Sequence, residues 1–204
     1  MSATTANVTG ALLPPPVESP WLLPDRGRVG MFCLIAAESA IFTIFVVAYV
    51  FYIGKSISGP TPREVLELPI FNTICLLSSS LTIHLAISAL RKGSRGMFTV
   101  LWALTMALGT IFLVGTGLEW KKLIYEKGLT IQTNLFGTTY YSLVGLHAFH
   151  VTVGLIGLGI VLVLALLGRV TQEHAHRCDV LSLYWHFVDV VWIVVFTVVY
   201  VIGR

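Results

Sequence analysis

The sequence predicts an all-α fold, a polytopic membrane bundle of five transmembrane helices. Hydrophobic residues make up 56% of the 204 residues and charged residues only 11%, whereas roughly a quarter of the residues in soluble proteins are charged. The mean hydropathy is +0.86. The apolar residues also fall into five stretches, each close to the ~20 residues that a helix needs to cross a bilayer. Any catalytic site in this chain would therefore lie within the membrane.

The chain divides into a short arm and one membrane domain. Residues 1–28 begin with a polar, proline-rich segment, and we expect an extended N-terminal arm there, on the cytoplasmic side. The first apolar stretch is longer than a signal-peptide core and is not followed by a cleavage pattern, so it should be retained as a span. Residues 29–204 form the five-helix domain, with spans at about 29–53, 69–90, 97–118, 136–167 and 180–202.

An odd number of spans places the two termini on opposite sides of the membrane. Lysine and arginine are nearly balanced between the two sides, so the positive-inside rule gives only a slight preference. Arg91, Lys92 and Arg95 crowd one very short turn on the N-terminal side. This favours a cytoplasmic N-terminus and an external C-terminus. The formal net charge of +3 is spread over helix ends, and no nucleic-acid partner is indicated.

One carboxylate lies inside the first span. Glu38 follows Val29 by nine residues, which at a rise of 1.5 Å per residue is roughly 14 Å into the membrane. A carboxylate at that depth either is protonated or meets a partner on another helix or subunit. A neutral glutamic acid that only hydrogen-bonds to a neighbouring helix is the alternative.

Two histidines share one face of the fourth span. His147 and His150 are three residues apart. Two nitrogens fill only half of a typical four-ligand shell, and no third ligand lies at helical spacing. We therefore expect these histidines to bridge helices by hydrogen bonds or to meet a lipid headgroup. An intramembrane metal site that also uses His186 is the alternative.

The last span repeats this spacing with a histidine and an aspartate. Asp189 can accept a hydrogen bond from His186 or hold it as a buried ion pair. We favour this structural pairing over proton transfer. Trp185 and Trp192 are seven residues apart and lie on nearly one face. They either pack between helices or join an interfacial aromatic belt, and Trp185 is the candidate for the belt.

Two further groups lie near helix ends. Glu119 ends the third span beside Trp120 and two lysines, and it either belongs to an interfacial anchor or lines the bundle. His174 and His176 fall in a polar connection, where we assign them no role. The chain has six histidines and no haem-attachment or HExxH motif. We therefore expect no catalytic residue, no metal site and no redox chemistry in this chain.

Two segments identify a family. Residues 145–154 (GLHAFHVTVG) and 184–192 (YWHFVDVVW) closely resemble the signature of subunit III of haem-copper terminal oxidases, the cytochrome c oxidase subunit 3 family. Shorter matches surround Glu38, residues 67–73 (ELPIFNT) and residues 118–120 (LEW). The resemblance extends from about Trp21 to Arg204.

The resemblance implies a non-catalytic subunit of a bacterial respiratory oxidase in the inner membrane. Its partners would be the large subunit I, which carries haem and copper, and the copper-binding subunit II. The family's subunit III binds phospholipid and supports the stability and proton uptake of subunit I. Glu38 would be the carbodiimide-reactive, proton-linked carboxylate. The helix-bridging or lipid-contacting residues would be Glu119, His147, His150, Trp185, His186, Asp189 and Trp192.

This chain departs from the longer members of that family. Those members have seven helices, with a lipid cleft between the first two and the other five. Five-helix forms occur in both cytochrome c and quinol oxidases. Residues 59–69 and 196–200 are nearer the quinol-oxidase version, whereas Glu38 is nearer the cytochrome c version. Subunit III of a quinol oxidase is therefore the alternative. An independent small membrane transporter is more remote, because no internal repeat or broken helix is evident.

Overall fold

The computed structural model describes residues 25–56 and 59–203. Most of the proposed N-terminal arm, residues 1–24, lies outside the described residues. In the part that is described, five helices are long and apolar enough to cross a membrane, and no strand occurs. The fold-class prediction is therefore confirmed. The long helices are α1 (Arg26–Tyr52), α3 (Ile70–Arg91), α4 (Arg95–Tyr125), α5 (Leu135–Leu166) and α6 (Ala175–Phe196).

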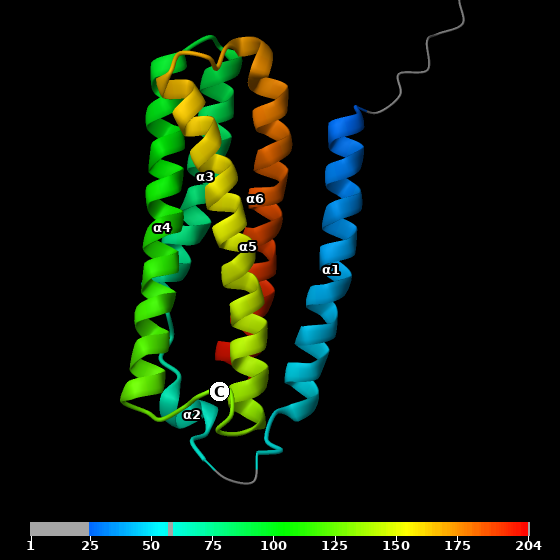
Figure 1. Ribbon diagram of the computed structural model, residues 1–204, viewed down its shortest axis with the longest axis vertical. Helices are drawn as coiled ribbons and strands as arrows, with labels where there is room; N and C mark the ends of the chain where they lie inside the picture. Colours follow the sequence, from blue (N-terminus) through cyan, green and yellow to red (C-terminus); the bar gives the residue numbers. More distant parts are fainter. Residues whose placement is uncertain (1–24, 57–58, 204) are drawn as a thin grey trace, which may run out of the picture.

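Three short elements complete the chain. They are helix α2 (Pro62–Val65), a 3₁₀ turn at Gln172–His174 that leads into α6, and a π-helical turn at Thr197–Ile202 that ends it. Because the number of spans is odd, the described chain begins and ends at opposite ends of the bundle (Figure 1).

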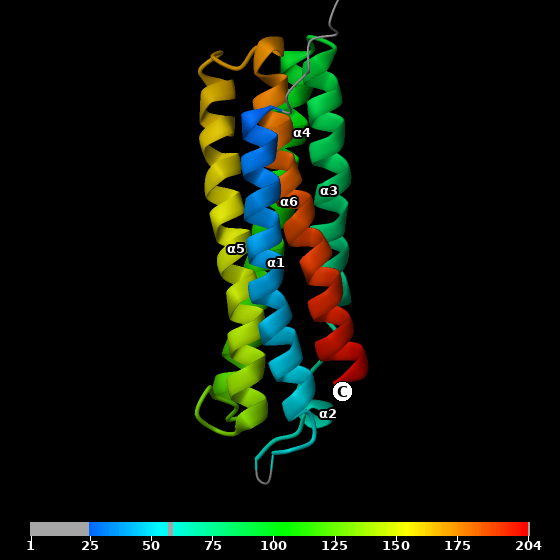
Figure 2. The ribbon, with the colours of Figure 1, turned by 90° about the vertical axis from the view of Figure 1, so that its right-hand side faces the viewer.

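Four of the long helices form a closed group, and the first helix leans against it. Helix α3 packs on α4 and α6, and α5 packs on the same two helices. Helix α1 contacts α5 and α6 only along one side, as two perpendicular views show (Figures 1 and 2). Its buried residues are Phe42 and Tyr49. The outward face of α1 is therefore uncovered.

Two of the helices extend well past the ends of the apolar stretches. Helix α4 continues to Tyr125, beyond the predicted end at 118, and Leu123 in this extension is buried. Helix α6 begins at Ala175, before the predicted start at 180, and Cys178 in its first turns is buried. Hydropathy marks where the apolar residues stop, whereas a helix continues as long as its backbone and packing allow.

Local signals set several helix ends. The Asp25 carboxylate accepts a hydrogen bond from the Arg28 amide at 3.2 Å, and Asn134 Oδ1 accepts one from the Gly137 amide at 2.8 Å. Both are N-cap contacts that satisfy otherwise unpaired amides. Between α3 and α4 the backbone turns at Gly93 with φ of +80°, a conformation that glycine adopts without steric cost.

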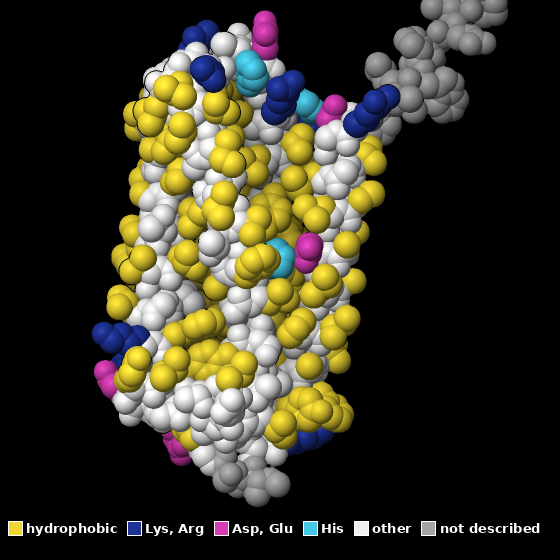
Figure 3. All heavy atoms as spheres, viewed as in Figure 1, with side chains coloured by type: hydrophobic (Ala, Val, Ile, Leu, Met, Phe, Trp, Pro, Cys, Tyr) yellow, Lys and Arg dark blue, Asp and Glu magenta, His cyan; other side chains and the backbone are white. Residues whose placement is uncertain are grey.

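The outer surface matches a membrane environment. On the face shown in Figure 3, lysine, arginine and most acidic side chains gather at the two ends, and hydrophobic side chains dominate between them. Polar side chains inside the membrane are costly unless they find partners. The candidate site consists of these side chains and their partners.

Candidate functional site

The carboxylate in α1 meets a histidine of α5. Glu38 is near the middle of its helix, and Glu38 Oε2 lies 3.1 Å from His150 Nε2. The other nitrogen, His150 Nδ1, donates to the Leu146 carbonyl at 2.8 Å. Nδ1 therefore carries a hydrogen. One further proton lies between Nε2 and Glu38 Oε2: either the carboxylic acid donates to Nε2, or the imidazolium donates to the carboxylate. This contact therefore joins α1 to α5 by a hydrogen bond inside the membrane.

His147, one helical turn away, has a different environment. It is completely buried, and its ring stacks on Trp192 at 5.0 Å between centroids and meets the edge of Phe112 at 5.8 Å. Neither ring nitrogen has a hydrogen-bond partner among the described residues. The expectation that His147 bridges helices by a hydrogen bond is wrong, because its neighbours are aromatic rings. It bridges α5 to α4 and α6 by packing.

His186 and Asp189 are joined through a third residue. Ser80 of α3 lies 2.8 Å from His186 Nδ1 and also donates to Asp189 Oδ2. The described residues show no direct hydrogen bond between the histidine and the aspartate, so the direct pairing expected from their spacing is wrong. Two side chains three residues apart on one helix can both point toward a neighbouring helix. Here that helix supplies a hydroxyl to both.

The two tryptophans attach α6 to α3. Trp185 Nε1 donates to Ser79 Oγ at 2.8 Å, and Trp192 Nε1 donates to Thr73 Oγ1 at 3.1 Å. Trp185 is fully buried, so of its two interpretations the structure supports packing between helices rather than an interfacial belt. The hydroxyl residues of α3 were missed from the sequence. The one sequence signal that could have found them is their spacing: Thr73 and Ser79 are six residues apart, close to the seven-residue spacing of the tryptophans that they face.

Glu119 lines the bundle and is not part of an interfacial anchor, which were its two interpretations from the sequence. Its Oε1 accepts hydrogen bonds from the hydroxyls of Tyr200 at 2.9 Å and Tyr140 at 3.4 Å. The π-helical turn at the end of α6 carries Tyr200 into this position. Trp120 packs edge-on against Tyr141 at 5.2 Å. Glu119 thus connects α4, α5 and the end of α6.

The histidines do not converge on a metal site. In residues 25–56 and 59–203, no group of three or more His, Cys, Asp or Glu side chains is placed to hold a metal ion. His147, His150 and His186 each have their own surroundings, as described above. The geometry therefore gives no support to the intramembrane metalloenzyme alternative.

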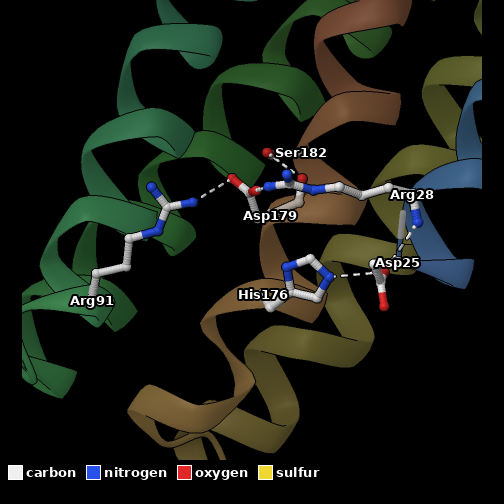
Figure 4. A network of polar contacts seen from close by, with 6 residues as sticks. All are labelled: Asp25, Arg28, Arg91, His176, Asp179 and Ser182. Atoms are coloured by element: carbon white, nitrogen blue, oxygen red, sulfur yellow. Dashed lines mark hydrogen bonds and ion pairs between the residues drawn. The ribbon is translucent and has the colours of Figure 1, made fainter. Parts of the chain in front are cut away.

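A second polar network joins three helices at the N-terminal end of α1 (Figure 4). Asp179 of α6 binds Arg28 of α1 at 2.5 Å and Arg91 of α3 at 2.9 Å. Beside it, His176 Nε2 lies 2.8 Å from Asp25 Oδ2. His176 therefore lies on a helix and contacts the start of α1, which corrects its placement in a solvated loop. Asp179 was missed because nothing local distinguishes it from a surface residue.

The environment of Asp25 affects its protonation. Its pKa is lowered from the ordinary value of 3.8, first by the hydrogen bond from His176 and then by the Arg28 amide. A carboxylate with a lowered pKa stabilises the folded state above its unfolded pKa, and this contribution is lost as the pH falls through the lowered value. The contribution of Asp25 is therefore complete at neutral pH and is lost only below pH 3.8, as the pH falls through the lowered pKa.

We expect Asp179→Asn to loosen the first turns of α1 without unfolding the protein. The arginines are 44% and 56% exposed, and exposed ion pairs contribute no more than about 1 kcal/mol each. Hydrogen–deuterium exchange should rise several-fold in residues 25–32, while the thermal midpoint of the complex stays nearly constant. High salt should reproduce the effect in the parent protein. Glu173→Gln, which changes an exposed carboxylate nearby, should leave exchange unchanged; equal exchange in both variants would contradict this role for Asp179.

Comparison with known proteins gives the family. The profile of the cytochrome c oxidase subunit III family matches residues 25–204. Cytochrome c oxidase subunit 3 of Synechocystis sp. is 40% identical over 188 residues, which cover 88% of this chain and 77% of the relative. The Alkalihalophilus pseudofirmus subunit 3 is 34% identical, with 86% of each chain covered. Cytochrome bo(3) ubiquinol oxidase subunit 3 of Pseudomonas aeruginosa is 32% identical, with 86% of this chain and 84% of the relative covered.

The family profile extends over all five spans and both segments that carry the resemblance. The chain therefore belongs to the cytochrome c oxidase subunit III family, membrane subunits of multi-subunit haem-copper oxidases.

Proposed function

We propose that this chain is subunit III of a bacterial cytochrome c oxidase, which reduces oxygen to water in aerobic respiration, and that it supports the catalytic subunit without carrying out redox chemistry. The family match over residues 25–204 carries this proposal. The polar side chains inside the membrane add support, because most of them contact other helices of the same chain. The relatives of higher identity reported above are named for cytochrome c oxidase.

The partners are subunit I, with the haems and copper, and the copper-binding subunit II. The uncovered face of α1 supports contact with another subunit or with phospholipid. Large apolar side chains on this helix are exposed, and Ile44 and Val47 are the most exposed, at 67% and 60%. We place phospholipid or a partner helix against that face.

Purification of the tagged chain from its host tests this function. The expected product is a complex that contains a large subunit with haem, and the isolated chain should show no haem spectrum. A stable, functional protein that purifies alone would contradict the proposal. A quinol oxidase is the second candidate, because relatives of that type match nearly the whole chain. A copper-binding ligand set in the copurified subunit II would indicate the cytochrome c type, and its absence would indicate the quinol type.

Glu38 is the proton-linked carboxylate in this proposal, and His150 shares its proton. Glu38→Gln should abolish labelling by a hydrophobic carbodiimide, because the reagent requires a carboxyl group. The amide keeps the size and hydrogen-bonding capacity of the side chain, so assembly should be nearly unchanged. Mass spectrometry of the labelled complex checks this, and Glu173→Gln should label like the parent. Labelling that persists at the parent level in Glu38→Gln would refute the assignment.

The remaining candidate residues hold the helices in place. We assign this role to Glu119, His147, Trp185, His186, Asp189 and Trp192. We propose that the protein lies in the bacterial inner membrane with a cytoplasmic N-terminus. In intact spheroplasts, an impermeant maleimide should label a Lys127→Cys variant above the parent level. A Ser94→Cys variant should react only after permeabilisation. The reverse pattern would invert the orientation.

A further inference from the structure

A groove lies between parts of α1 and α6 inside the membrane. It has a volume of about 530 Å³, within the range of pockets that hold small molecules. Its walls are aliphatic and aromatic except at three positions: Ser39 and Thr43 on α1, and His186 on α6. A small molecule in the groove would therefore meet an apolar surface with polar atoms on both walls.

The two hydroxyls on α1 are hydrogen-bond acceptors toward the groove. Ser39 Oγ donates its hydrogen to the Ile35 carbonyl at 2.7 Å, and Thr43 Oγ1 donates to the Ser39 carbonyl at 2.7 Å. Each hydroxyl has a single hydrogen, so only lone pairs remain. This wall offers acceptors and no free donor.

The imidazole on the opposite wall is also an acceptor. Ser80 donates its one hydrogen to Asp189, so at His186 Nδ1 it can only accept. Nδ1 therefore carries the proton of the neutral imidazole, which leaves Nε2 with a lone pair. Nε2 has no hydrogen-bond partner in the described part of the chain. The Ser80–Asp189 contact thus sets which hydrogen-bonding group His186 offers to a ligand.

The depth of His186 restricts the kind of ligand. The span Gln172–Ile202 has 31 residues, and His186 lies near its centre, roughly 20 Å from either end at 1.5 Å per residue. The headgroup of a phospholipid stays near the membrane surface. A hydroxyl donor at this depth must belong to a molecule whose polar group can lie in the bilayer interior.

We propose that this groove binds the ring of a membrane hydroquinone, with its two hydroxyls donating to His186 Nε2 on one wall and to Ser39 or Thr43 on the other. The oxidised quinone carries two acceptors and finds no donor here, so the reduced form binds more tightly. An alcohol with a single hydroxyl would satisfy only one wall. The proposal involves binding without electron transfer, and it holds whichever electron donor the oxidase uses.

Photolabelling of the intact complex tests the site. The probe is an alkyl hydroquinone that carries a diazirine, used without oxygen on cyanide-inhibited oxidase and compared with the same molecule as the quinone. Modified residues should map to the facing sides of α1 and α6, with about tenfold more labelling by the reduced form. Equal labelling by the oxidised form, or labelling only elsewhere, would overturn the proposal. So would labelling of these residues by a phospholipid with a mid-chain diazirine that unlabelled hydroquinone does not displace.

Variants distinguish loss of binding in the groove from general disruption of the protein. The double variant Ser39→Ala and Thr43→Val should reduce labelling by the hydroquinone several-fold, while Ile193→Val, outside the groove on α6, should not. Ser80→Ala frees the Nδ1 position of His186, so the preference for the reduced form should fall toward equality. A preference that survives Ser80→Ala would refute the role of the Ser80 contact. Full labelling of the double variant would refute the role of the α1 wall.

Discussion

Gly154→Leu should remove this subunit from the assembled oxidase. A Cβ atom at Gly154 would lie 2.8 Å from Trp185 Cε3 and Cζ3, closer than side-chain contacts allow. The indole has no room to move, because a Cβ at Gly109 on α4 would also lie 2.8 Å from the same ring. The ring is fully buried and its Nε1 is bound to Ser79. Overpacking in a core of this kind typically costs 1–3 kcal/mol or more. The amount of subunit that copurifies with the complex, and its thermal midpoint, measure the effect.

A matched glycine distinguishes crowding from the loss of a flexible residue. Gly117 lies on α4 with no atom within 4 Å of its Cβ position, so Gly117→Leu should assemble normally. Gly154→Ala should have an intermediate effect. Trp185→Leu in the Gly154→Leu background should restore part of the lost subunit, because it frees the space that leucine needs. Normal assembly of Gly154→Leu alone would show that α5 and α6 can separate without loss of the subunit.

Glu119→Leu should release the C-terminal turn. The hydroxyls of Tyr140 and Tyr200 are buried and both point to this carboxylate. They lie 3.3 Å from each other, so without Glu119 one can donate to the other, and at least one buried donor remains unpaired. An unpaired buried donor costs about 1–3 kcal/mol. Hydrogen–deuterium exchange should therefore increase in residues 197–203, and the thermal midpoint should fall.

Two controls define the cause of that change. Glu119→Gln retains a carbonyl acceptor, so exchange at the C-terminal turn should stay close to that of the parent. Glu126→Leu changes an exposed acidic residue at the end of the same helix, and it should have no effect on the turn. Parent-like exchange in Glu119→Leu would mean that apolar packing alone holds the π-helical turn.

Most residues of the candidate site could be predicted from the sequence. Few of the contacts that these residues make with other helices could be predicted. Glu38 and His150 were both identified from their cost in the membrane, but only the structure showed that they contact each other. His147 was identified for the same reason, yet its surroundings are aromatic rings. Ser80 was not identified, because a serine in a membrane helix carries no charge and its hydroxyl can hydrogen-bond to a backbone carbonyl of its own helix.

The sequence by itself determined the number of spans, most of the polar residues inside them and the family. These properties depend on the local run of apolar residues, on a constant rise per residue and on short motifs. Only the tertiary structure decided which groups meet. Ser80 contacts His186 and Asp189 across 106 and 109 positions of the chain, and Asp179 brings together arginines from α1 and α3. Such partners depend on how the helices are rotated against one another, and that rotation arises from side-chain packing over the whole bundle.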